Sequence, residues 1–265
     1  VSTLGGTAFS AGDSATQMRY PSDVVFSGGV LYVSESLNHD IANIFPPFRV
    51  VAAGDSNIVG SYADGSAASA RFYGPAGLVM VGANLYVADV NNQLIRKFDT
   101  ISGMVSTFAG QQGVAGTADG PGTSATFAGP SALESDGTYL YVGDAQGFKI
   151  RRILISTGVV DTLSGVGTLG GQVDGISAEA QFGQVRDLAY LAGNLYVADL
   201  SNHAVRKVNT STGSVTTVAG RRDRGTYVDG AGSAAGFSYP TGLAIAGGAL
   251  FVSDPGNFVI RKFTG

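Results

Sequence analysis

The feature that most constrains the fold of this chain is a repeat with a period of 55 residues. An Asp-Gly pair recurs at this spacing, at Asp64, Asp119, Asp174 and Asp229. A phenylalanine and a second aspartate recur in the same register, at Phe72, Phe127, Phe182 and Phe237 and at Asp89, Asp144, Asp199 and Asp254. A divergent copy precedes these four, since Leu31-Tyr32-Val33 matches Leu250-Phe251-Val252. The chain therefore holds five copies of one structural unit.

Each copy predicts four short strands. In the last copy we expect them at residues 215–219, 241–245, 249–253 and 258–263. These segments are rich in Val, Thr, Ile and Phe and are separated by glycine, of which the chain has 40, and no segment keeps a helical period. Short strands repeated at this spacing are typical of a β-propeller, in which each repeat forms one four-stranded blade.

The order of short motifs within each repeat resembles that of the NHL-repeat family of propellers. Residues 215–262 read Val-Thr-Thr-Val-Ala-Gly, Asp-Gly, Pro-x-Gly-Leu and Ile-Arg-Lys in that order, and residues 105–152 follow the same pattern. The resemblance covers essentially the whole chain. It implies a toroidal all-β fold that usually serves as a binding or scaffolding platform, with a few enzymatic relatives. NHL propellers commonly have six blades, so five copies depart from the family pattern.

The two ends of the chain carry complementary strands. Residues 1–6, Val-Ser-Thr-Leu-Gly-Gly, match the strand expected at 215–220, whereas the last copy stops just after its Arg-Lys strand. We expect the N-terminal strand to join the last blade and close a five-bladed ring as one domain, 1–265, because closure removes open strand edges. The alternative is an incomplete six-bladed NHL propeller. Val1 in place of a start Met indicates a processed product or a segment of a longer chain.

Composition excludes several classes of function. The chain has no cysteine, which excludes disulfides, thiolate zinc sites and cysteine nucleophiles. Its two histidines cannot supply the three-His metal coordination of NHL-type amidating lyases, and we predict no metal and no cofactor. A net charge of −4 argues against nucleic-acid binding, and no apolar run of 18 residues exists for membrane insertion.

A repeated aspartate precedes a repeated arginine by seven residues, which places the two residues on adjoining strands of a hairpin. We interpret these pairs as structural, because a guanidinium forms paired hydrogen bonds with a carboxylate. The pairs are Asp89 and Arg96, Asp144 and Arg151, Asp199 and Arg206, and Asp254 and Arg261.

The Asp-Gly loops are the first candidate binding site. In a propeller they would gather on one rim, with Tyr62 and Tyr227 two residues before their aspartates; the alternative is that Asp and Gly are ordinary turn residues. Arg222 and Arg224 occur in the last loop alone, and symmetry of the fold does not require them. The predicted site for an acidic or hydroxyl-rich ligand comprises Tyr62, Asp64, Asp119, Asp174, Arg222, Arg224, Tyr227 and Asp229.

The third residue of each innermost strand faces the expected axial channel. Asp23 and Asp187 are the acidic residues at this position, and Arg186 is adjacent. Two carboxylates in a confined channel could raise each other's pKa or share a cation. The alternative is that channel water solvates them.

The sequence therefore predicts a non-catalytic module that binds protein or glycan, as a structural or adhesive part of an extracellular or cell-surface assembly. A sequon at Asn209 and the low lysine content favour that location. We favour a protein partner over a glycan, because the chain has no Trp to stack on sugars. The alternatives are a lectin with sugar sites between blades and a lyase or hydrolase that uses the axial mouth.

Overall fold

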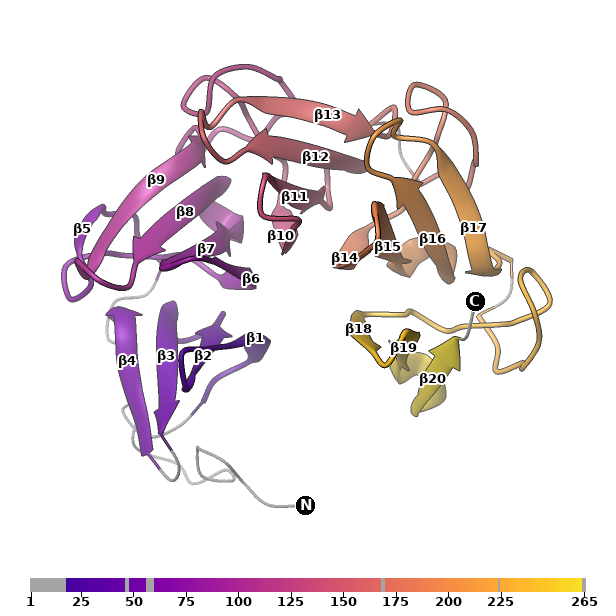
Figure 1. Ribbon diagram of the computed structural model, residues 1–265, viewed down its shortest axis with the longest axis horizontal. Helices are drawn as coiled ribbons and strands as arrows, with labels where there is room; N and C mark the ends of the chain where they lie inside the picture. Colours follow the sequence, from indigo (N-terminus) through magenta and orange to yellow (C-terminus); the bar gives the residue numbers. More distant parts are fainter. Residues whose placement is uncertain (1–17, 46–47, 56–59, 168–169, 224, 264–265) are drawn as a thin grey trace. The chain divides into compact units, whose positions relative to one another are not determined.

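The computed structural model describes residues 18–45, 48–55, 60–167, 170–223 and 225–263. These residues form five antiparallel sheets, with short turns within a sheet and long connections between sheets, and Figure 1 gives the strand labels. The fold class is the one that the sequence predicts, an all-β five-bladed β-propeller with one sheet per repeat. No described helix is long and apolar enough to cross a bilayer.

The chain divides into two compact units, Val1–Pro130 and Ser131–Gly265. The first unit holds two sheets. One has the order β1-β2-β3-β4, with bounds Pro21–Ser27, Val30–Glu35, Asp40–Phe45 and Phe48–Gly54. The other has the order β5-β9-β8-β7-β6, in which the four main strands are β6 (Pro75–Val81), β7 (Asn84–Asp89), β8 (Leu94–Asp99) and β9 (Met104–Gly110), and β5 (Gly65–Ser66) adds two residues beside β9.

The second unit holds three sheets. The first has the order β10-β11-β12-β13, with bounds Pro130–Ser135, Tyr139–Asp144, Lys149–Leu154 and Val160–Ser164. The next has the order β14-β15-β16-β17, with bounds Val185–Leu191, Asn194–Asp199, Ala204–Asn209 and Val215–Gly220. In the last, three described strands lie in the order β18-β19-β20, with bounds Gly242–Ala246, Ala249–Asp254 and Val259–Phe263.

The strands expected in the last copy are found within one or two residues of their predicted bounds, as β17 to β20. Short 3-10 helices follow the second strand of three repeats, at η1 (Val90–Asn92), η2 (Leu200–Asn202) and η3 (Pro255–Asn257). The predicted closing strand at residues 1–6 lies outside the described residues. Closure by that strand, and the single domain, therefore stay predictions.

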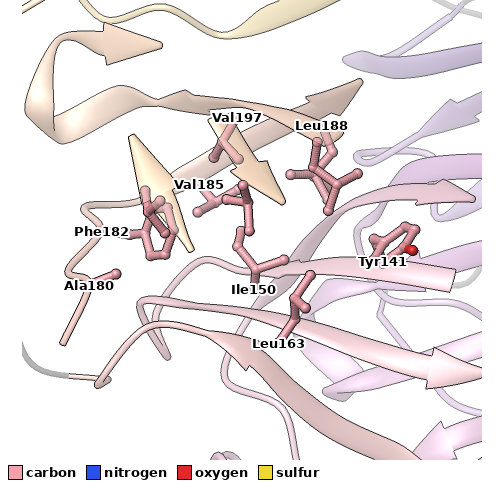
Figure 2. Close-up of a cluster of buried hydrophobic side chains, with 12 residues drawn as sticks. Tyr141, Ile150, Leu163, Ala180, Phe182, Val185, Leu188 and Val197 are labelled. Carbon is pink, nitrogen blue, oxygen red and sulfur yellow. The ribbon is translucent and has the colours of Figure 1, made fainter. Parts of the chain in front are cut away.

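Apolar side chains join neighbouring sheets within a unit. Figure 2 shows Ile150 and Leu163, from β12 and β13, facing Phe182, Val185 and Leu188 of the next repeat. Phe182, one of the phenylalanines of the 55-residue repeat, is fully buried in this cluster. Full burial of a large apolar side chain stabilises a fold by about 1.5–3 kcal/mol. Phe182 thus packs the long connection between two repeats against the core.

Candidate functional site

The geometry of the last four repeats centres on the arginine that each of them carries, and the β14–β17 sheet shows the arrangement in full. Arg206 donates to the Asp199 carboxylate at 2.9 Å and to the Asp174 carboxylate at 2.7 Å. Its remaining bonds go to the carbonyl oxygens of Gln181 at 2.9 Å and Val173 at 2.8 Å. Since the side chains of Arg206 and Asp199 are wholly buried, their charges are compensated inside the protein.

Two other repeats reproduce this network. Arg96 binds Asp89 at 2.9 Å and Asp64 at 2.6 Å. Arg261 binds Asp254 at 3.3 Å and Asp229 at 2.6 Å. In the third repeat Arg151 lies 3.3 Å from Asp144. The seven-residue spacing therefore brings each arginine onto its aspartate, as the hairpin geometry predicts.

Aromatic rings enclose the same guanidinium groups. The Arg96 guanidinium lies 4.9 Å from the ring centre of Tyr62 and 5.2 Å from that of Phe72. Arg261 is placed in the same way, 4.8 Å from Tyr227 and 5.1 Å from Phe237. Cation–π contacts of this kind favour a charged guanidinium that is shielded from water.

Burial shifts the pKa values of two of the repeated aspartates, Asp89 and Asp199. Burial raises the pKa of Asp89 to about 6, although the charge of Arg96 and hydrogen bonds from Asn92, Tyr73 and Arg96 act in the opposite direction. Burial likewise raises the pKa of Asp199, against the charge of Arg206. Both carboxylates have no exposed surface, so neither is accessible to a substrate in this conformation.

The aspartates of the Asp-Gly loops are more exposed than those of the Asp-Arg pairs, but three of them accept hydrogen bonds from the same arginines. The side chains of Asp64, Asp174 and Asp229 are 41%, 46% and 75% exposed. Each gives at least one oxygen to the arginine of its own repeat, while Asp119 is exposed on the connection between β9 and β10. Asp64, Asp174 and Asp229 therefore stabilise the fold of their own repeats, and ligand binding by the Asp-Gly loops stays a prediction.

The connection between β17 and β18 carries the residues that no other repeat has. Arg221 forms an exposed ion pair with Asp223 at 2.9 Å, and the Arg222 backbone N–H donates to the Gln172 side chain at 2.8 Å. Tyr227 is 55% exposed, and its hydroxyl donates to Asp229 at 3.3 Å. The predicted Arg224 lies outside the described residues. The structure thus brings Tyr227 and Asp229 together.

A cavity of about 480 Å³ lies beside this connection, along β20. Its polar lining includes Tyr227, Asp229, Arg261 and Lys262, and Phe237 and Val252 are among its apolar lining residues. No described strand pairs with the side of β20 that faces away from β19. The cavity therefore combines an unpaired strand edge with the Asp229 carboxylate.

Exposed aromatic side chains flank the same repeat. Tyr239 is 52% exposed and Phe258, in the turn after η3, is 94% exposed. The two connections that carry them are joined by a hydrogen bond from the Gly256 N–H to the Ser238 carbonyl at 3.0 Å. Tyr227 lies on the same connection as Tyr239, between β17 and β18, and a bridge between Gly225 and Phe237 folds this connection back on itself.

The predicted channel aspartates each bind backbone groups of the next repeat. Asp23 accepts from the Leu78 N–H at 2.7 Å, and Asp187 accepts from the Leu243 N–H at 2.6 Å. Burial raises the pKa of Asp23, while its hydrogen bonds from the backbone lower it. Arg186 is exposed. The aspartates therefore connect consecutive repeats, and an acid/base or cation-binding role stays a prediction.

A further kind of contact between consecutive repeats, made by the side chain that follows the second-strand turn, was not predicted from the sequence. The residue after each second-strand turn has a positive φ, and in three repeats its side chain accepts a backbone N–H from the next repeat. His39 Nδ1 accepts from Gly74 at 3.1 Å, Gln93 Oε1 accepts from Gly129 at 2.7 Å, and His203 Nδ1 accepts from Tyr239 at 3.1 Å. The equivalent positions of His39, Gln93 and His203 in their repeats were the available signal, but the change from histidine to glutamine obscured it.

The first repeat also departs from the network. Glu35 takes the place of the repeated aspartate and Ala42 that of the arginine. Glu35 is wholly buried, with one carboxylate oxygen 3.3 Å from the Asn38 amide nitrogen and the other 3.2 Å from the Arg19 backbone nitrogen. A longer acid bonded to local donors thus replaces the buried ion pair of the other repeats.

Two curated proteins match most of the chain. The chloroplastic Protein SUPPRESSOR OF QUENCHING 1 of Arabidopsis thaliana is 28% identical over 248 residues, which cover 88% of this chain. Human NHL repeat-containing protein 2 is 25% identical over 284 residues, which cover 94% of this chain. The chain is an NHL-repeat β-propeller. No family model matches it.

This NHL propeller spans 23% and 39% of the length of those two relatives. Among solved structures, an auxiliary nutrient binding protein of Bacteroides ovatus superposes with a TM-score of 0.70 at 20% identity, covering 95% of this chain and 60% of that one. Virginiamycin B lyase of Staphylococcus aureus superposes at 0.59 and 12% identity, covering 91% and 65%. At these identities the likeness shows the fold alone.

Proposed function

We propose that this NHL propeller is a non-catalytic interaction module that binds a protein partner, as a structural or adhesive part of an extracellular or cell-surface assembly. The observation that carries the proposal is the group of exposed aromatic residues on two linked connections of the last repeat, with Tyr227 and Tyr239 between β17 and β18 and Phe258 between β19 and β20. Tyrosine and arginine supply a large share of the binding energy at protein interfaces, and exposed Arg222 lies on one of these connections.

The charged groups of the repeats support binding over catalysis. The buried Asp-Arg pairs are enclosed, and the more exposed aspartates are bound to the same arginines. Catalytic acids and bases need a substrate within hydrogen-bond reach. The repeated carboxylates therefore serve the scaffold in this proposal, and the exposed connections serve recognition.

Site-specific photocrosslinking tests the proposal. A crosslinking phenylalanine analogue is placed at position 258 of the full chain, expressed in cells that make the protein naturally, and the same analogue at Ile101, which is 85% exposed on another connection, is the matched control. We expect one protein to crosslink from position 258 and not from position 101, and Arg222→Glu to abolish that crosslink. If the same proteins crosslink equally from positions 258 and 101, or if R222E leaves the crosslink from position 258 unchanged, there is no specific protein-binding surface here.

The lectin alternative predicts a different result. Equivalent sugar sites between blades would give binding on a glycan array that survives R222E and is lost stepwise on changes in several repeats. Such a result would replace the protein partner by a glycan.

A further inference from the structure

The Asp-Gly loop of the last repeat has a different backbone conformation from the equivalent loops. The loop glycines of the three preceding repeats have φ values between 134° and 145°, and they are Gly65, Gly120 and Gly175. Gly230 lies outside this positive-φ region. Every residue from Gly225 to Gly230 is exposed, whereas Gly65 and Gly175 are half-buried. The last loop therefore presents the peptide bond between Asp229 and Gly230 to water.

The amide of this peptide bond is less constrained than its equivalents. The Gly175 N–H donates to the Val215 carbonyl at 3.1 Å, and Gly65 of β5 is paired with Val105 of β9. Among the residues that the structure describes, none accepts a hydrogen bond from the Gly230 N–H. Exposed backbone with few hydrogen bonds opens at a low free-energy cost. The Gly230 nitrogen can therefore turn toward a neighbouring side chain more readily than the nitrogen of either other glycine.

The carboxylate that precedes Gly230 is also held by fewer donors. The Asp174 carboxylate accepts from the arginine of its repeat at 2.7 Å and from the N–H and hydroxyl of Thr217 at 2.8 and 2.9 Å. The Asp229 carboxylate accepts from its arginine at 2.6 Å and from the Tyr227 hydroxyl at 3.3 Å. Its side chain is 75% exposed, against 46% for Asp174. Asp229 thus has more freedom to bring its carboxyl carbon to the Gly230 nitrogen.

We propose that Asp229 is a site of spontaneous covalent modification, at which the chain isomerises to isoaspartate. The Gly230 amide nitrogen bonds to the Asp229 carboxyl carbon, and one carboxyl oxygen leaves as water with the amide proton and a proton from the solvent. One water then adds to the α-carbonyl carbon of the five-membered imide, breaks the bond from that carbon to the Gly230 nitrogen and releases a proton. The main chain now runs through the former side chain. Glycine favours the first step because it has no Cβ to obstruct its nitrogen.

Isomerisation changes how the last repeat is held together. Asp229 and Arg261 are 2.6 Å apart. In isoaspartate the free carboxylate is attached directly to Cα and the main chain is one carbon longer, so the carboxylate is displaced from Arg261. Arg261 retains its hydrogen bonds to Asp254 and to two carbonyl oxygens, while the Tyr227 hydroxyl loses its acceptor. The modification is therefore a slow change in the surface beside Tyr227, and it occurs whether or not that surface binds a protein.

Timed incubation of the full chain at neutral pH tests the proposal. Isoaspartate is located in proteolytic peptides by mass spectrometry with electron-transfer fragmentation, which distinguishes it from aspartate. Asp64 and Asp174 in the same molecule are internal controls, and incubation in urea removes the local structure at all three sites. The matched variant is Gly230→Ala, which keeps Asp229 and adds a methyl group beside the reacting nitrogen. The added Cβ would lie 3.1 Å from the Cβ of Ala234, which a small shift accommodates.

We expect isoaspartate to accumulate at position 229 several-fold faster than at positions 64 and 174 in the folded protein, and at similar rates at all three positions in urea. We expect G230A to slow the reaction at position 229 several-fold. The proposal is overturned if position 229 stays unmodified in the folded protein, if position 64 or 174 reacts as fast, or if position 229 is equally favoured in urea. It is also overturned if folded G230A reacts as fast as the wild type. Should G230A not fold, the comparison of the three positions within the wild type decides.

Discussion

Acid should destabilise this protein through its two histidines, which hold backbone N–H groups of the following repeats. Each imidazole accepts a hydrogen bond at Nδ1 and must therefore lack a proton there. Burial lowers the pKa of His39, and burial also lowers that of His203, although the charge of Asp254 acts in the opposite direction. A protonated ring would turn an N–H donor toward the N–H that it now accepts.

The sign and size of the effect follow from this geometry. Because the folded pKa lies below the ordinary value of 6.5, the stabilisation is complete at pH values above 6.5 and is lost as the pH falls toward the folded pKa. The slope of the unfolding free energy with pH is at most about 1.4 kcal/mol per pH unit for each histidine. At the buried Gly74 N–H the loss approaches the cost of an unpaired buried group, about 1–3 kcal/mol, and it is smaller at the Tyr239 N–H, which is exposed to water. At about 2–4 °C per kcal/mol for a chain of this size, the thermal midpoint would fall by several degrees.

Glutamine provides the matched variant, because Gln93 already performs this contact in the second repeat through Oε1. The double variant His39→Gln, His203→Gln keeps an acceptor at both positions and removes the titration. Thermal unfolding followed by circular dichroism at pH 7.5 and pH 5.5 should give similar midpoints for both proteins at pH 7.5 and a smaller acid loss for the variant.

The buried aspartates do not confound this comparison. Burial raises the pKa of Asp89 to about 6, so its contribution to stability increases as the pH falls through that value, opposite in sign to the histidines. That contribution is present in both proteins and cancels in their difference. An identical pH dependence of the wild type and the double variant would refute the reasoning.

Four further changes test the scaffold and the location of the protein. Arg206→Met leaves Asp199 buried without its counter-charge and should lower the unfolding free energy in urea by about 3–5 kcal/mol; a loss below 1 kcal/mol would contradict the buried-pair interpretation. Phe182→Ala should cost about 3–5 kcal/mol in the same assay, because it opens a cavity in the core of Figure 2. Asp187→Ala should cost about 1–3 kcal/mol for each N–H it leaves unpaired, and more than Asp187→Asn, which keeps an acceptor. Asn209→Gln should remove a glycan from protein secreted by eukaryotic cells, and an unchanged mass would contradict the sequon prediction.

Several parts of the site could be read from the sequence because they repeat. The seven-residue spacing of Asp199 and Arg206 predicted their pairing, since a hairpin of fixed length places the two strands in a fixed register. The second ligand of the same arginine could not be read in this way. Asp174 is 32 residues away, and its approach depends on how the long connection folds against the sheet.

The contacts between consecutive repeats also could not be predicted from the sequence. Asp23 looked like a channel carboxylate because the pattern of small residues defines only which side of the strand it occupies. Its bond to Leu78 follows from the distance between two sheets, which no spacing within one repeat encodes. His39 and His203 were ambiguous for the same reason, because their acceptor role depends on a partner in the following repeat.

By itself, the sequence determined the period, the number of repeats, the four-stranded pattern and the buried Asp-Arg pairs, because these depend on alternation and spacing within one hairpin or one repeat. Tertiary structure alone decided that the loop carboxylates serve the scaffold, that two aspartates and two histidines link consecutive repeats, and that a cavity lies along β20. These features depend on the packing of separate sheets and connections, and packing is set by side chains that are distant in the chain.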